Sequence, residues 1–279
     1  MTREVYHPAE KPGQAPDQAR VLVVVPVRDS SPPARAALDR VLASVSAGQG
    51  ERADVVLVVP PSCRGLRELA RARGVEVVDD PGAGTAGAVE AGVGAAGAGH
   101  RYVCWLTSDD ELLPGALDVA VARLEACPDA VLAYGDCRVV TGEEEYLCTP
   151  HAAPPSSWRL LAGTPDLPRS AVLIRVAAWR DAGGLDTTLR YAMDLDLLLR
   201  LRSRGPFVPT CRTLAVFHVP ARPLGAAEIA AVMAEVTSVR RRYLPPALRQ
   251  ASRVLDVPHR LLASRTPSVV QRAAVPSGL

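Results

Sequence analysis

A run of branched aliphatic residues near the start of the sequence constrains the fold most. Residues 21–25 are all Val or Leu, and Pro26 ends the run. An uninterrupted apolar strand is typical of a parallel sheet covered by helices on both faces, whereas a half-exposed strand alternates apolar and polar residues. The chain is therefore expected to build a layered α/β domain around this strand.

Strand and helix patterns alternate along the rest of the N-terminal half. Each predicted strand is an apolar run, and each predicted helix places apolar residues three or four positions apart. We expect strands at 54–59, 75–78 and 101–106, and helices at 34–47, 65–73 and within the glycine-rich segment 81–99. This alternation indicates a doubly wound, mostly parallel sheet.

The C-terminal half has a mixed pattern. We expect strands at 130–134, 137–140 and 170–174, a polar turn at 142–145, and helices at 114–126, 175–182 and 194–204. From Leu224 onward, two or three arginine-rich helices are predicted to pack on the α/β domain. Mixed basic and apolar residues also suit a weak contact with an anionic membrane surface, so both roles stay open.

Composition excludes several classes of protein. A hydrophobic content of 48% in 279 residues supplies a full core, and a net charge of +2 gives no overall attraction to nucleic acid. Segment 1–19 lacks the apolar centre of a signal peptide, and no apolar run reaches the roughly 18 residues that span a bilayer. Because no CxxC pair occurs, we expect a cytoplasmic protein with reduced cysteines; they are Cys63, Cys104, Cys127, Cys137, Cys148 and Cys211.

Two adjacent acids follow one of the predicted strands. Asp109 and Asp110 come directly after the apolar run that contains Trp105, at the carboxyl end of a strand, where open α/β sheets bind their ligands. Neighbouring carboxylates repel each other unless a cation or hydrogen-bond donors lie close, and a hard divalent cation with phosphate oxygens suits such a position. The alternative is that one acid caps a helix and the other is solvated.

Several blocks of the sequence, taken together, resemble a family 2 glycosyltransferase of the GT-A fold over roughly residues 20–220. The blocks, in order, are Val21-Leu22-Val23-Val24-Val25-Pro26, Gly82-Ala83-Gly84 with Ala88-Val89-Glu90-Ala91-Gly92, Trp105-Leu106-Thr107-Ser108-Asp109-Asp110 with Leu113-Pro114-Gly115-Ala116-Leu117, Tyr134-Gly135-Asp136, Gly183-Gly184-Leu185-Asp186, and Tyr191-Ala192-Met193-Asp194-Leu195-Asp196-Leu197-Leu198-Leu199-Arg200. The resemblance implies a Rossmann-like GT-A domain at 20–222, with a mostly parallel central sheet flanked by helices. A loose leader at 1–19 precedes it, and a C-terminal helical extension with a disordered end follows at 223–279.

The resemblance also assigns roles to individual side chains. Asp109 would hold Mg²⁺ or Mn²⁺ against the two phosphates of a nucleoside diphosphate sugar, with Asp110 as a near neighbour and His218 as a further metal ligand. Asp194 would be the general base that takes the proton of the acceptor hydroxyl in an inverting displacement. The alternatives are a helix cap for Asp194 and an ordinary strand histidine for His218.

Two residues further along the same predicted helix are assigned to the acceptor side. They are Asp196 and Arg200, whose four-residue spacing equally predicts an ion pair along one face of the helix. Asp196 also lies near the start of that helix, where a structural role is the alternative.

The predicted donor site is completed by residues at strand ends and in loops. They are Pro26, Arg28, Asp79, Asp80 and Gly84. One departure from the family pattern concerns the second strand, which in the family ends in an acid that contacts the nucleotide but here ends in Pro60-Pro61. Proline offers neither an N–H nor a side-chain acceptor, so nucleotide recognition has to come from other residues.

The implied activity is metal-assisted transfer of a hexosyl group, with inversion, from a nucleoside diphosphate sugar to an acceptor hydroxyl. The acceptor is a glycan, a lipid-linked molecule or a small molecule, and no nucleic acid partner is expected. A weak peripheral contact of the C-terminal helices with the inner face of the membrane is also expected. Two alternatives stay open: a catalytically impaired GT-A domain that acts as a binding or scaffold protein, and a related nucleotidyltransferase.

Overall fold

The computed structural model describes residues 20–28, 31–48, 53–107, 110–140, 146–148, 160–161, 167–218, 225–245 and 249. The predicted leader, the polar turn at 142–145 and the helices expected beyond 249 lie outside these residues. Asp109 lies outside them as well.

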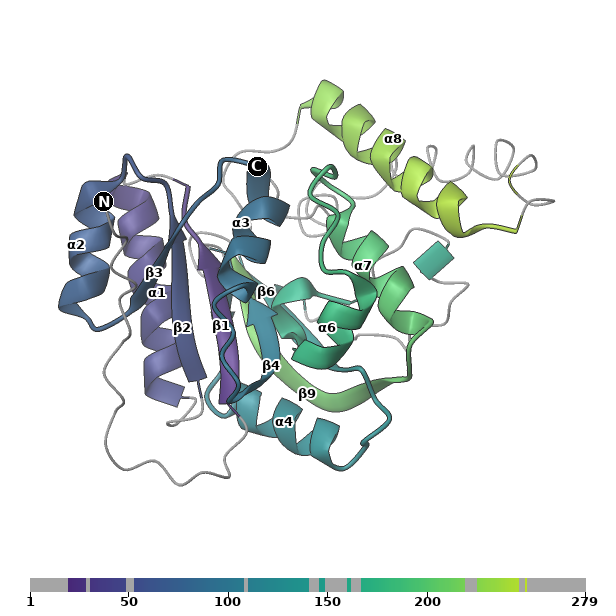
Figure 1. The fold of residues 1–279 in the computed structure, drawn as a ribbon, viewed down its shortest axis with the longest axis horizontal. Coiled ribbons are helices and arrows are strands. Elements are labelled where there is room, and N and C mark those ends of the chain that lie inside the picture. The colour runs from purple at the N-terminus through teal and green to yellow at the C-terminus, as the bar shows by residue number, and fades with distance from the viewer. Residues whose placement is uncertain are drawn as a thin grey trace, which may run out of the picture.

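A single mixed sheet forms the centre of the described structure (Figure 1). Its strands are β1 (Arg20–Pro26), β2 (Ala53–Val59), β3 (Glu76–Asp79), β4 (His100–Trp105), β5 (Asp110–Leu112), β6 (Leu132–Val140), β7 (Tyr146–Cys148), β8 (Val172–Arg175) and β9 (Phe207–His218). The order is β3-β2-β1-β4-β8-β6-β9-β5, with β7 paired to β6. Strands β3, β2, β1 and β4 are parallel, as the alternating pattern predicted.

Helices cover both faces of the sheet. They are α1 (Pro32–Gly48), α2 (Arg64–Ala72), α3 (Gly84–Val93), α4 (Ala116–Glu125), α6 (Val176–Ala182), α7 (Met193–Arg202) and α8 (Ala226–Tyr243). Val23 of β1 shares an apolar cluster with α1, α2 and α4, whereas Leu22 shares one with α3, α6 and α7. The central strand is therefore buried on both faces, which confirms the α/β fold class predicted from the uninterrupted apolar run.

Two predictions for the sheet are wrong. The strands expected at 130–134 and 137–140 form one strand, β6, which passes through Gly135. A Cβ atom at Gly135 would lie 2.5 Å from the carbonyl oxygen of Arg212, so glycine here permits close pairing with an irregular stretch of β9 and does not end the strand. Asp110, expected on a loop, begins β5, because β9 supplies a pairing partner from a distant part of the chain.

The antiparallel strand β8 brings a distant segment to the end of β4. Tyr102 of β4 pairs with Arg175 of β8, and Val103 pairs with Ile174. Residues before β8 therefore lie beside residues after β4. The 3₁₀ turn η2 (Arg169–Ala171) lies in this position, so its Arg169 reaches the carboxyl end of β4.

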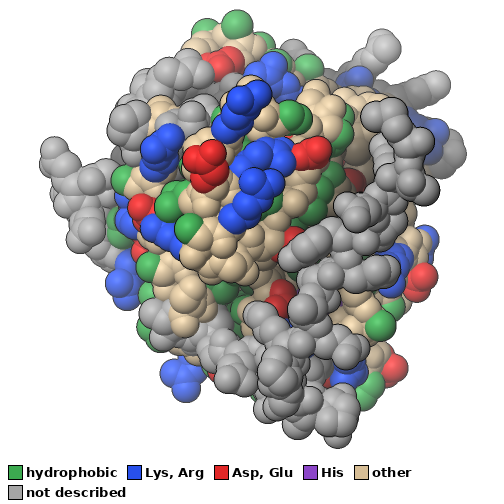
Figure 2. Space-filling view, turned by 60° about the vertical axis from the view of Figure 1, so that its left-hand side comes forward, with side chains coloured by type: hydrophobic (Ala, Val, Ile, Leu, Met, Phe, Trp, Pro, Cys, Tyr) green, Lys and Arg blue, Asp and Glu red, His purple; other side chains and the backbone are tan. Residues whose placement is uncertain are grey.

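Charges of both signs cover the side of the molecule that carries α1 and α2 (Figure 2). Arg73 pairs with Asp39 on this side, and Arg67 pairs with Asp79. Among the described residues, no helix is long and apolar enough to cross a membrane.

Candidate active site

The predicted donor residues lie at the carboxyl edge of the parallel strands. Pro26 ends β1, and the Arg28 guanidinium just beyond it donates to the Thr85 hydroxyl in the first turn of α3. Asp79 ends β3, and Asp80 Oδ1 accepts the N–H of Gly82 at 2.8 Å. This edge, where neighbouring parallel strands end together, is the usual ligand site of an open α/β sheet.

Two of these residues differ in how freely they could contact a ligand. The Asp79 side chain is 71% exposed and forms an ion pair with Arg67. Asp80 instead shapes the turn that leads to Gly84, the first residue of α3, through its bond to Gly82. The structure thus places Pro26, Arg28, Asp79, Asp80 and Gly84 along one edge of the sheet, and their contact with a donor stays a prediction.

Asp110 is fully buried, with 0% exposure, and joins two segments. Its Oδ2 accepts the N–H and the hydroxyl of Thr107, both at 2.8 Å, and a guanidinium N–H of Arg169, also at 2.8 Å. The other oxygen, Oδ1, is buried and has no partner among the residues that the structure describes. Asp110 is therefore neither a helix cap nor a solvated acid, because its carboxylate links the end of β4 to η2.

Asp194 lies in the first turn of α7, close to this cluster. Burial raises the pKa of Asp194 from 3.8 to about 6; the positive charge of Arg169 opposes the rise, and the negative charge of Asp110 adds to it. Among the described residues, no hydrogen-bond partner contacts the buried Oδ1 of Asp194. A carboxylate that is costly to ionise, with an unpaired oxygen, is suited to accept a proton near neutral pH.

Neither Asp194 nor Asp196 caps α7. No side chain of the cap residue Ala192 bonds to the helix start. The carboxylate of Glu235, on the distant helix α8, accepts backbone N–H groups there instead. The sequence around α7 could not predict the contact with Glu235, because Glu235 lies more than 40 residues further along the chain.

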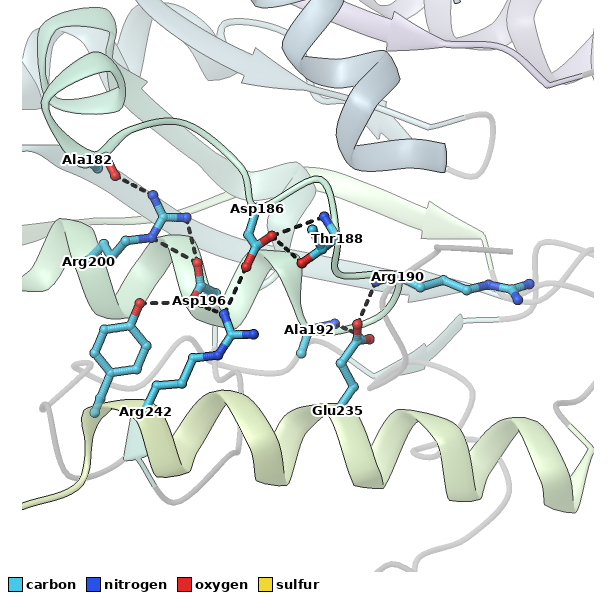
Figure 3. Close-up of polar contacts among 10 residues, drawn as sticks. Ala182, Asp186, Thr188, Arg190, Ala192, Asp196, Arg200, Glu235 and Arg242 are labelled. Atoms are coloured by element: carbon cyan, nitrogen blue, oxygen red, sulfur yellow. Dashed lines mark hydrogen bonds and ion pairs between the residues drawn. The ribbon is translucent and has the colours of Figure 1, made fainter. Parts of the chain in front are cut away.

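Asp196 and Arg200 form the ion pair that their spacing predicted. Arg200 Nε donates to Asp196 Oδ2 at 2.8 Å, and the Tyr243 hydroxyl of α8 donates to Oδ1 at 2.8 Å. Asp196 is only 3% exposed, and Arg200 also donates to the carbonyl oxygen of Ala182 (Figure 3). These contacts hold α7 against α6 and α8, which agrees with the structural role given above as the alternative. The assignment of Asp196 and Arg200 to the acceptor side stays a prediction.

His218 lies at the end of β9 and faces an acid from the neighbouring strand. Its Nε2 is 2.7 Å from Glu111 Oε1, and Arg40 Nε donates to the same oxygen at 3.2 Å. Among the described residues, no group of three or more His, Cys, Asp and Glu side chains is arranged to hold a metal ion. Metal binding by Asp109, Asp110 and His218 therefore stays a prediction.

Glu90 is a half-buried acid whose role the sequence did not reveal. It lies on α3, and its Oε1 accepts the N–H of Leu185 at 2.5 Å. Burial raises the pKa of Glu90, while the bond from Leu185 and a bond from Trp179 oppose the rise. Gly184 adopts φ +66, and a Cβ atom there would lie 2.5 Å from the same oxygen. The Gly183-Gly184 break thus lets the loop before α7 dock on α3.

Family membership follows from comparison with known proteins. The sequence matches the family described as glycosyl transferase family 2 over residues 22–165, which is about half of the chain. The chain therefore belongs to this family, and it is a glycosyltransferase. The match confirms the resemblance drawn from the sequence blocks. No curated protein matches the chain significantly.

Solved structures of TarS from S. aureus are similar in fold. The complex of TarS residues 1–349 with UDP-GlcNAc has a TM-score of 0.61 at 12% identity, covering 82% of this chain and 69% of that chain. The complex of the same TarS fragment with UDP has a TM-score of 0.60 at 13% identity, covering 82% and 68%. A longer TarS structure gives 0.59 at 14% identity, and this chain spans 41% of it. At these identities the likeness establishes the GT-A fold.

Proposed function

We propose that this glycosyltransferase moves a hexosyl group from a nucleoside diphosphate sugar to an acceptor hydroxyl with inversion, and that Asp194 is the general base. The observation that carries the proposal is the carboxylate of Asp194: burial raises its pKa to about 6, and its buried Oδ1 has no hydrogen-bond partner in the part of the chain that the structure describes. A base with a pKa slightly below neutrality is ionised at pH 7 and still basic enough to take a proton from a hydroxyl in the transition state.

The donor is proposed to lie along the carboxyl edge of β1 to β4. The TarS structures of similar fold include complexes with UDP and UDP-GlcNAc, which supports a nucleotide-sugar donor here. The Arg28 guanidinium contacts Thr85 in the first turn of α3, where a positive charge and the positive end of a helix both favour phosphate groups. Since β2 is followed by Pro60-Pro61, we expect Asp79 and Asp80 to contribute to nucleotide recognition.

A divalent cation, Mg²⁺ or Mn²⁺, is part of the proposal. Asp110 offers only one oxygen to such a cation, its buried Oδ1, because Oδ2 already accepts three hydrogen bonds, one of them from a guanidinium. The support for a metal is therefore the position of Asp109 after β4, together with the family resemblance. When bound, such a cation would neutralise charge on the diphosphate leaving group.

For the acceptor and for the cellular location of the protein, we propose broad classes. The acceptor is a glycan, a lipid-linked molecule or a small molecule. The absence of CxxC pairs from the sequence supports a reduced, cytoplasmic setting. The arginine-rich sequence after Leu224 supports a weak contact with the inner face of the membrane.

A donor screen tests the proposal. Nucleotide release from UDP-, GDP- and dTDP-sugars is measured with Mn²⁺ for the native chain and for Asp194→Asn. We expect one donor class to be turned over and Asp194→Asn to lower turnover at least about 100-fold. Asp181→Asn, which changes an exposed acid of α6, is the matched control and is expected to keep native turnover.

The screen also decides between the proposal and its main rival. The replacement of the usual second-strand acid by Pro60-Pro61 favours a GT-A domain that binds a partner without turnover. Binding of UDP, GDP or dTDP without release from any sugar would support that rival. Native turnover by Asp194→Asn would instead show that another group acts as the base.

A further inference from the structure

Helix α8 contacts the segment around α7 through several charged and polar side chains (Figure 3). Near the C-terminal end of α8, Arg242 donates to Asp186 at 2.8 Å, and the Tyr243 hydroxyl donates to Asp196. Asp186 precedes α7, and Asp196 lies within it. Both contacts join side chains to side chains, so they attach α8 to this segment without binding the backbone that begins α7.

Glu235, in the middle of α8, makes a different kind of contact. Its Oε1 accepts the N–H of Arg190 at 2.6 Å, and its Oε2 accepts the N–H groups of Tyr191 and, at 3.1 Å, Ala192. Ala192 is the cap residue of α7. One carboxylate therefore receives three consecutive backbone N–H groups directly before the turn that carries Asp194.

We propose that Glu235 is a positioning residue: by binding the backbone at 190–192, it fixes the first turn of α7 and with it the place of Asp194. The proposal rests on the proposed function, in which Asp194 is the base. Helix α8, which lies outside residues 22–165 that match the family, would then help to form the acceptor side of the site.

The charge of the Glu235 carboxylate explains why its contact with the backbone would fix the position of the first turn of α7. Hydrogen bonds from N–H groups to an ionised carboxylate are shorter and stronger than those between neutral groups. A negative charge is also favoured at the amino end of a helix by the aligned peptide dipoles. Because no side chain of the cap residue holds the start of α7, the direction of its first turn depends on this contact from α8.

Precise placement of the base matters for rate. The proton acceptor has to lie within hydrogen-bond reach of the acceptor hydroxyl, and a displacement of about 1 Å can cost on the order of 100-fold in turnover. Asp194 lies two positions after Ala192, so a shift of the cap is transmitted to it through a rigid helical turn. The proposed donor residues Arg28, Asp79 and Asp80 lie on segments that Glu235 does not contact, so donor binding should be unaffected.

The test compares Glu235→Ala and Glu235→Gln with Arg242→Ala in the full chain. Arg242→Ala is the matched control, because it removes another contact between α8 and the same segment, and its ion pair with Asp186 is half-exposed. Hydrogen exchange of the amides at 190–192 is measured, together with turnover and donor KM for nucleotide release from UDP-, GDP- and dTDP-sugars with Mn²⁺. Circular dichroism checks that each variant is folded.

For Glu235→Ala we expect at least tenfold faster exchange at 190–192, turnover lowered about 10- to 100-fold, and donor KM within about twofold of native. Glu235→Gln, which keeps one acceptor oxygen but no charge, is expected to fall between Glu235→Ala and the native chain. Arg242→Ala is expected to keep native exchange at 190–192 and native turnover.

Three outcomes would overturn the proposal. Native exchange in Glu235→Ala would show that the carboxylate does not hold this backbone. Faster exchange with native turnover would show that the contact does not position the base. Equal losses in Glu235→Ala and Arg242→Ala, in turnover and in donor KM, would show only a general loosening of α8. If the native chain releases nucleotide from no sugar, the proposed function fails, and the exchange measurement still decides whether Glu235 fixes the start of α7.

Discussion

Replacing the proposed base should make the protein more stable at neutral pH. The pKa of Asp194 is raised from 3.8 to about 6, so the fold favours the protonated carboxyl group. A difference of about two pH units corresponds to about 3 kcal/mol, at about 1.4 kcal/mol for each unit. This figure is an upper value, because residue 194 as a whole is partly exposed although its carboxylate Oδ1 is buried.

The sign of the pH dependence follows from linkage. A raised pKa in the folded state contributes stability that is fully present below the unfolded value of about 3.8 and is lost as the pH rises through about 6. At pH 7.5 the ionised Asp194 therefore costs the native chain up to about 3 kcal/mol, whereas Asp194→Asn avoids this cost. By pH 4 the difference between the two proteins should almost disappear.

Urea unfolding at pH 7.5 and pH 4 measures both values. The matched control is Asp196→Asn, two residues away on α7, where both carboxylate oxygens are paired. That variant should destabilise the protein by about 2 kcal/mol at pH 7.5, opposite in sign to Asp194→Asn. The reasoning is refuted if Asp194→Asn is no more stable than the native chain at pH 7.5, or if its advantage is the same at pH 4.

The remaining predictions concern packing, acid stability and the metal. Gly92→Ala places a Cβ atom 2.4 Å from Val24 Cγ1, which overpacks the contact between α3 and β1. We expect this to outweigh the gain in helix propensity and to lower the free energy of unfolding by about 1 to 2 kcal/mol. An unchanged urea midpoint would contradict this. Burial alone would raise the pKa of Asp54, but bonds from His100 and Arg20 outweigh it and lower the pKa to about 2. The stability that Asp54 contributes is thus present above about pH 3.8 and lost as the pH falls towards 2, so the difference from Asp54→Asn in urea unfolding should be constant between pH 5 and 7 and shrink below pH 4. EDTA should stop nucleotide release and excess Mn²⁺ should restore it; full turnover in EDTA would remove the metal from the proposal.

The layered α/β architecture could be predicted from the sequence because it depends on local patterns. An uninterrupted apolar run such as 21–25 needs a covering layer on each face, and the structure places apolar helices on both. The order of strands and glycine-rich loops also placed Arg28 and Asp79 at the carboxyl edge of the sheet. These features follow from the periodicity of each segment, which is contained in neighbouring residues.

Contacts between distant segments could not be predicted in the same way. The sequence predicted two strands, at 130–134 and 137–140, yet they form one strand in which β9 approaches Gly135 closely enough to exclude a side chain. Asp110 looked like a solvated or metal-binding acid, yet antiparallel pairing of β8 with β4 brings Arg169 to it.

The arrangement around Asp194 shows the physical reason most clearly. The sequence alone identified Asp194 as an acid at the start of an apolar helix, since helix periodicity and the family blocks are local features. Burial and the negative charge of Asp110 in β5 raise the pKa of Asp194, the positive charge of Arg169 in η2 opposes that rise, and Glu235 from α8 holds the backbone before it. Carboxylate side chains bind whichever donors the folded chain brings within about 3 Å, and only the tertiary structure decides which donors those are.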